Sequence, residues 1–144
     1  MRISTKGRYA LRVMIDLALH DNGEYIPLKD VSKRQGISVK YLEQIIPLLN
    51  KAGYLNSSRG SNGGYRLARP TDSYTAYDIL QTTEGTLAPI ACLENGNGCE
   101  QAPNCKVLPF YDGLNRAIVD YLVGVTLTDL VQQEKGTEVI DYQI

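Results

Sequence analysis

The sequence predicts a mainly α-helical fold with a small β-hairpin, in which a winged helix-turn-helix is followed by a long C-terminal dimerisation helix. Three observations predict it: apolar residues recur with a helical period in the first half, a glycine-rich segment separates two short extended runs, and a second long apolar stripe lies near the C-terminus. The 144 residues suit one domain with an appendage. We expect a winged unit over 1–85, a cysteine-containing loop over 86–106, and a dimerisation helix with a tail over 107–144.

The first two helices are expected from their caps. Ser4 or Thr5 can cap the first, because a side-chain oxygen there accepts a hydrogen bond from a free amide of the first turn. Its apolar stripe consists of Tyr9, Ala10, Val13, Met14, Leu17 and Ala18. The segment LKDVSKRQ, residues 28–35, follows as a short second helix that Gly36 ends in a left-handed cap.

The third helix is expected to begin after Ser38, a favourable N-cap, and to end at Gly53. Its buried side consists of Leu42, Ile45, Ile46 and Leu49. Pro47 lacks the N–H that would bond the carbonyl of Glu43, so it predicts a kink there and not an end. Two helices joined by a tight turn containing glycine form a helix-turn-helix.

A hairpin follows this unit. The runs YLNSS (54–58) and YRL (65–67) enclose RGSNGG, which is a glycine-rich turn. A helix-turn-helix followed directly by a basic hairpin has the order of a winged helix. Thr75 and Asp78 then have the spacing of a capping box, which predicts a helix ending at Gly85 and packed under the winged unit.

Charge is distributed unevenly along the chain. Residues 1–70 contain 12 basic and 5 acidic side chains, a net charge of +7, and the remaining 74 contain 3 basic and 11 acidic ones, a net charge of −8. Such a division suggests that the first half meets a polyanion, although a chance asymmetry between two solvated faces would give the same numbers.

The basic half offers candidate DNA-binding residues on the third helix and the wing. The exposed N-terminal face of the helix carries Ser38, Lys40, Tyr41 and Gln44, which suit a major groove. Arg59 suits a narrow minor groove, and Gly60 allows the backbone close to phosphates. Helix-helix-hairpin units also occur as protein-interaction modules, but these would not need the basic half or the basic wing tip. Double-stranded DNA is therefore the expected partner.

Every cysteine lies in one loop: Cys92, Cys99 and Cys105, with spacing C-x6-C-x5-C. Three cysteines cannot all pair within one chain, and a reducing cytosol disfavours structural disulfides. Zinc usually takes close C-x2-C pairs, which are missing from this loop. The pattern favours an iron–sulfur cluster, whose sulfurs the backbone amides of a flexible loop can bond. A thiol switch, zinc and three inert thiols remain as alternatives.

Four parts of the chain together resemble the Rrf2 family of bacterial regulators: MRISTKGRYALRVM, ISVKYLEQI, SSRGSNGGYRLARP and the three-cysteine loop. The resemblance runs from Met1 to about Leu130 and is greatest to the iron–sulfur members that regulate cluster biogenesis. It implies a dimeric winged-helix transcription factor with a 2Fe-2S cluster held by the three cysteines. It also places Tyr41, Glu43 and Arg59 on positions that the family uses to read DNA. A cysteine-metabolism repressor of the same family lacks the cysteine triplet.

The fourth cluster ligand departs from the family pattern. The middle cysteine spacing is one residue longer, Leu108 stands where the iron–sulfur members have a ligand histidine, and Arg8 stands where nitric-oxide sensors have an aspartate. His20 reads as a helix-end histidine favoured by the helix dipole. We hypothesise that Glu43 is the fourth metal ligand, because a carboxylate on a basic recognition helix needs neutralisation. Alternatively Glu43 faces DNA or solvent, and solvent or a small thiol completes the cluster.

The segment after the loop predicts a dimer interface. Pro109 suits the first turn of a helix that Gly124 ends, and its apolar stripe is too long for its own small domain to cover. The stripe consists of Phe110, Leu114, Ile118 and Leu122, with Tyr111 and Tyr121 alongside. Packing on the chain's own winged unit is the alternative. We expect a short capped helix over 125–136, followed by an extended tail over 137–144. As a homodimer the chain would read a partly palindromic operator.

These features predict a transcriptional regulator of the repressor type that senses iron–sulfur cluster status and controls cluster-biogenesis genes. The alternative is control by cysteine oxidation or by a protein partner, without a cluster. No Ser/His/Asp set, phosphate loop or paired carboxylates beside a histidine supports an enzyme or a small-molecule substrate. No apolar run approaches the roughly 18 residues that span a bilayer, so we expect the cytoplasm and no membrane partner.

Overall fold

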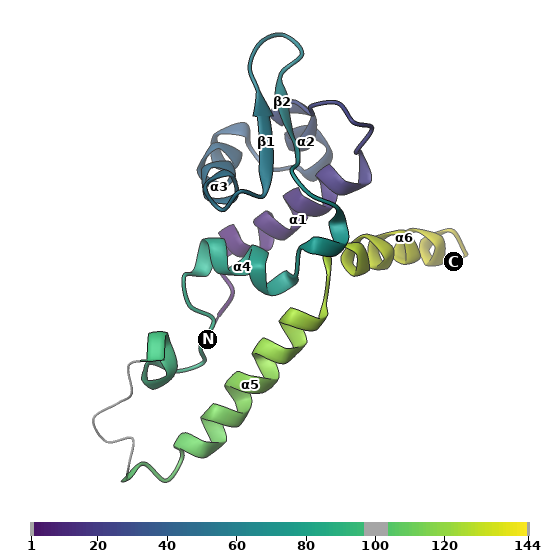
Figure 1. Cartoon of the computed structure of the whole chain (residues 1–144). Coiled ribbons are helices and arrows are strands. Elements are labelled where there is room, and N and C mark those ends of the chain that lie inside the picture. Colours follow the sequence, from purple (N-terminus) through teal and green to yellow (C-terminus); the bar gives the residue numbers. More distant parts are fainter. Residues whose placement is uncertain (1, 97–103, 144) are drawn as a thin grey trace.

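The structure, a computed structural model, describes residues 2–96 and 104–143. A helical body carries one two-stranded hairpin, as the sequence predicts (Figure 1). The elements are α1 (Thr5–Leu19), α2 (Leu28–Gln35), α3 (Val39–Lys51), β1 (Leu55–Ser58), β2 (Gly64–Leu67), the 3-10 turn η1 (Thr71–Ser73), α4 (Ala76–Glu84), the 3-10 turn η2 (Ala91–Gly96), α5 (Leu108–Gly124) and α6 (Leu127–Gln143).

Helix α1 is the centre of the winged unit, since it contacts α2, α3, α4, β2 and α6. Its core residues Ala10, Val13 and Met14 are fully buried. Ser4 is the N-cap and accepts a hydrogen bond from the amide of Gly7, while the Ser4 amide and hydroxyl both donate to Glu84 at the end of α4, each at 2.8 Å. These bonds fix α1 across α4.

The helix-turn-helix forms as predicted. Gly36 follows α2 in the left-handed conformation, with φ of 66°, and Ser38 caps α3 through a 3.1 Å bond from the amide of Tyr41. Pro47 lies inside α3 and does not end it. Both boundaries therefore come from short-range signals in the sequence.

The hairpin is tied to the body by a third extended segment. Strands β1 and β2 pair antiparallel with Leu55 opposite Leu67. Ile26 pairs with Tyr65 on the far side of β2 through two hydrogen bonds of 2.8 Å. A Cβ at Gly64 would lie 2.2 Å from the carbonyl oxygen of Ile26, so only glycine permits this approach. The wing thus has a fixed base beside the loop between α1 and α2.

The C-terminal part leaves the winged unit along two helices. Thr75 and Asp78 form the predicted capping box of α4, and α5 begins near Pro109 and ends at Gly124 as expected. In Figure 1, α5 extends from the body as an arm. Among the described residues, no helix is long and apolar enough to cross a membrane.

The tail differs from the prediction. Instead of a short helix followed by an extended segment, α6 runs without interruption from Leu127 to Gln143. Thr126 and Asp129 form a reciprocal cap at its start, and Leu127 is fully buried. The expected stop at Gly136 is wrong, because a glycine inside a helix costs only about 1 kcal/mol and no proline follows it.

Candidate nucleic-acid interface

Helix α3 presents one face to the core and the other to solvent. Leu42, Ile45, Ile46 and Leu49 are buried, with exposed fractions of 3% or less. The opposite face leaves Ser38, Lys40, Glu43 and Gln44 exposed. We call this exposed N-terminal part of α3, together with Arg59 and Gly60 of the wing, the reading surface. The sequence-predicted DNA-binding residues on α3 therefore lie on one accessible face.

Tyr41 differs from the other members of the reading surface because it is half-buried. Its ring packs edge-on against Tyr9 of α1, with 5.4 Å between ring centroids. The guanidinium of Arg12 lies 5.1 Å from the centre of the Tyr9 ring and donates hydrogen bonds to the side chain and carbonyl of Gln35. Tyr41 is thus held in place by α1 and by the last turn of α2.

The wing supplies the second part of the reading surface. Arg59 and Gly60 are exposed at its tip, and Gly60 has φ of 104°, a conformation that favours glycine. A Cβ at Gly63 would lie 2.3 Å from the carbonyl oxygen of Ser58, so the turn that leads the chain back into β2 also requires glycine. Figure 1 shows the wing beside α3, projecting beyond the helical body.

An ion pair between a buried carboxylate and a partly exposed guanidinium joins α1 to α2 and was not predicted from the sequence. Asp16 is fully buried, and its carboxylate accepts hydrogen bonds from Arg34 at 2.7 and 3.0 Å and from Gln35 at 2.9 Å. The hydrogen bonds to this carboxylate raise the pKa of the Arg34 guanidinium above its ordinary value. The pair fixes the end of α2 immediately before the turn to α3. Its one sequence signal is a carboxylate inside the apolar stripe of the first helix.

Replacing Ser38 by alanine should lower the free energy of unfolding by about 1 kcal/mol, because the amide of Tyr41 loses its capping partner. DNA affinity should fall several-fold as well, since the cap lies on the reading surface. Thr75→Ala is the matched control, because it removes the cap bond from the amide of Asp78 at the start of α4, away from this surface. Denaturant unfolding and DNA titration measure both effects. If both variants lost the same DNA affinity, the Ser38 cap would have no specific role in shaping the reading surface.

The 3-10 turn η2 lies on the other side of α4 from α3 (Figure 1). Cys92, within η2, and Cys105, just before α5, are both half-buried, and Cys99 lies outside the described residues. Within the described ranges, no three His, Cys, Asp or Glu side chains are close enough to hold one metal ion. One chain therefore does not gather Glu43 with Cys92 and Cys105, and the ligand assignment of Glu43 stays a prediction.

Comparison with known proteins places these features in one family. The model of the Rrf2 family, described as an iron-dependent transcriptional regulator, matches residues 3–133. The HTH-type transcriptional regulator IscR of Vibrio cholerae is 38% identical over 144 residues, which cover 99% of this chain and 82% of that protein.

Solved structures agree with this assignment. CymR, the global cysteine regulator of B. subtilis, superposes with a TM-score of 0.77 at 36% identity, over 92% of this chain and 98% of CymR. IscR of T. potens gives a TM-score of 0.73 at 33% identity, over 93% of this chain and 88% of the other. The chain therefore belongs to the Rrf2 family of transcriptional regulators.

Proposed function

We propose that this regulator is a homodimeric repressor that binds a partly palindromic operator and senses iron–sulfur cluster status through a 2Fe-2S cluster, controlling cluster-biogenesis genes. One observation carries the proposal: a basic reading surface and three cysteines at the spacing C-x6-C-x5-C occur in one small chain. The first feature suits DNA and the second suits iron and sulfide. Their combination suits a sensor.

The DNA part is supported by the geometry of the reading surface. Lys40 and Gln44 are exposed on the outer face of a helix whose other face is buried, so they can reach base edges without a change in the packing of the core. Arg59 stands at a tip whose glycines let the backbone approach phosphates. A dimer places two such helices about 34 Å apart, one turn of B-DNA, which is why we expect a palindromic site.

The cluster part is supported by the chemistry of the donor set. Cys92 and Cys105 are thiols at the two ends of the loop that contains Cys99, and thiolates are the ligands that iron–sulfur clusters take in most proteins. These three residues would hold the cluster, with Glu43 as the hypothesised fourth ligand. When bound, the cluster would supply a change of charge and oxidation state, which can bias the arrangement of the loop and of α5.

A second candidate function has its own support. CymR is named a cysteine regulator, and it superposes on this chain as well as IscR does. Leu108 in place of a ligand histidine leaves the fourth coordination position open. Control through cysteine oxidation or a protein partner, without iron, is therefore the alternative.

The test is anaerobic purification followed by DNA titration. The cluster proposal expects a brown protein with about two irons per chain, and different DNA affinities for the holo and iron-free forms on the same duplex. Replacing Cys92, Cys99 and Cys105 together by serine should remove the iron, the visible absorption and the difference in affinity. A colourless anaerobic protein whose affinity responds to oxidants would favour the alternative function.

Glu43→Ala separates the ligand role from the reading role. Loss of a ligand should change the visible spectrum and shorten the lifetime of the cluster in air. Glu43→Gln is the conservative companion, since it keeps the size and removes the charge. An unchanged spectrum and lifetime in both variants would eliminate the ligand role. Any change in DNA affinity would then come from lost contacts between Glu43 and DNA.

A further inference from the structure

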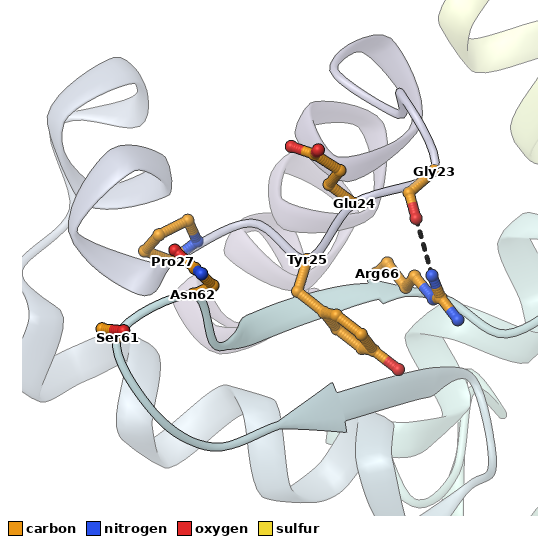
Figure 2. Close-up of a pocket in the computed structure, with 7 residues that line it drawn as sticks. All are labelled: Gly23, Glu24, Tyr25, Pro27, Ser61, Asn62 and Arg66. Carbon is orange, nitrogen blue, oxygen red and sulfur yellow. Dashed lines mark hydrogen bonds between the residues drawn. The ribbon is translucent and has the colours of Figure 1, made fainter.

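An open groove lies between the wing and the loop that joins α1 to α2. It has a volume of about 500 Å³. Figure 2 shows its lining, which comprises Gly23, Glu24, Tyr25 and Pro27 from the loop and Ser61, Asn62 and Arg66 from the hairpin. The loop and the hairpin are held together by the Ile26–Tyr65 pairing, so the two walls belong to one rigid base.

Arg66 is held in a fixed position in this groove. Its guanidinium stacks on the ring of Tyr25, with 4.3 Å to the ring centroid, and donates a 2.6 Å hydrogen bond to the carbonyl of Gly23 (Figure 2). A guanidinium has five N–H donors, so most of them stay available to another acceptor. Stacking and the single backbone bond reduce the freedom that Arg66 would lose on binding a ligand.

The charge of Arg66 has no neutralising partner among the described residues, whose ion pairs join Asp16 to Arg34 and His20, and Asp112 to Arg116. Glu24 lines the same groove, but its carboxylate points away from the guanidinium in Figure 2. Ser61 and Asn62 lie on the same hairpin at the wing-tip end of the groove, where their hydroxyl and amide add hydrogen-bond donors to the lining (Figure 2). A fixed guanidinium without an acidic partner, in a groove that also carries neutral donors, suits an anionic oxygen ligand.

The position of the groove identifies the anion. Ser61 and Asn62 directly follow Arg59 and Gly60, so the wing tip that belongs to the reading surface also forms one wall of the groove. DNA that reaches Arg59 would therefore pass close to the mouth of the groove. The groove lies along β2, and α3 contacts the hairpin through β1.

We propose that Arg66, stacked on Tyr25, binds a backbone phosphate of DNA on the side of the wing away from α3. This inference rests on the proposed DNA binding and extends the reading surface beyond the sequence-predicted residues. Guanidinium and phosphate form paired hydrogen bonds in a shared plane, and such contacts fix the register of a protein on DNA without reading sequence. Arg66 thus adds affinity and sets the position of the wing on the duplex.

The test is Arg66→Leu in the full chain, titrated against a duplex selected by the wild-type protein from a random-sequence pool. Affinity should fall on the order of 5-fold at 0.15 M salt. The slope of log affinity against log salt concentration should become shallower by about 0.9 for each protomer bound, because one phosphate contact is lost. Arg66→Lys should keep the slope and lose part of the affinity, since it keeps the charge and loses the planar stack.

Arg69→Leu is the matched control, because it removes the same charge from an arginine that stacks on Tyr54 and Tyr74 beyond β2. Its slope should equal that of the wild type. A loss of affinity in Arg66→Leu without a change of slope would overturn the phosphate contact, and so would equal slope changes in both leucine variants. Wild-type protein that selects no duplex at all would instead refute the proposed DNA binding itself.

Discussion

Replacing Arg34 by methionine should lower the free energy of unfolding by about 3 kcal/mol at neutral pH. The substitution leaves the Asp16 carboxylate fully buried and removes both of its hydrogen bonds from the guanidinium. An unpaired buried charge costs more than the lost pair was worth. Gln35 keeps its bond to Asp16 and His20 stays 3.8 Å from the carboxylate, and these partners hold the loss near the lower end of the usual range. Denaturant unfolding at fixed protein concentration measures it.

Arg8→Met is the control for this experiment. Arg8 lies on α1 with an exposed side chain that bonds only the nearby hydroxyl of Thr5 among the described residues, so its replacement should stay within about 0.5 kcal/mol of the wild type. The double variant Asp16→Leu with Arg34→Met should recover most of the loss, because two apolar groups can replace a buried pair at little cost. A loss below about 1 kcal/mol in Arg34→Met would contradict an energetically important ion pair.

The same pair should matter for DNA binding. Arg34 and Gln35 end α2 just before the turn at Gly36, and Gln35 also receives the bonds from Arg12, whose guanidinium lies over Tyr9. Tyr9 in turn packs on Tyr41 of the reading surface. A variant that loosens the end of α2 therefore also loosens the support of α3, and affinity should fall together with stability.

The sequence predicted the elements of the winged unit well because their signals are short-range. Ser38 and Gly36 mark the turn within three residues, and Thr75 with Asp78 marks the start of α4 in the same way. Each signal is a side chain or glycine that completes the hydrogen bonding of its own helix end. Such signals need no knowledge of the rest of the fold.

The contacts that position the site could not be predicted, because they join distant residues. Asp16 and Arg34 are 18 residues apart, and Arg66 reaches Gly23 across 43 residues. Ile26 forms a single isolated bridge, which is too short to have an alternating strand pattern. The groove beside the wing therefore became visible only in the structure, although Tyr25 and Arg66 can be read directly from the sequence.

The apolar residues expected to form one stripe on the long helix lie on two sides of α5 in the structure. Ile118 and Leu122 are half-buried on the chain's own side of α5, whereas Phe110 and Leu114 are exposed together with Tyr121. A sequence pattern alone shows that a helix is apolar on much of its surface but not which neighbour covers each part. Helix α4 packs on one side of α5, and the other side is the one that the proposed dimer would cover.

Replacing Leu114 by glutamate should convert the proposed dimer into a monomer. The exposed side of α5 carries residues at alternating spacings of three and four, which is the pattern of a coiled-coil seam. They are Val107, Phe110, Leu114, Ala117 and Tyr121. Phe110 and Tyr121 are 66% and 69% exposed in the single chain, and the small Ala117 lets two such helices approach closely. A buried charge at the middle of this seam has no partner.

The expected result is a protomer-sized species in analytical ultracentrifugation and a loss of about 10²-fold or more in affinity for a palindromic duplex. Separate chains lose the effective concentration that joins the two half-sites. Arg116→Glu is the control, since it places the same side chain on an exposed position of α5 outside the seam. Leu114 is itself exposed in one chain, so the winged unit should keep its helical content by circular dichroism. A Leu114→Glu protein that stays dimeric would place the interface elsewhere on the molecule.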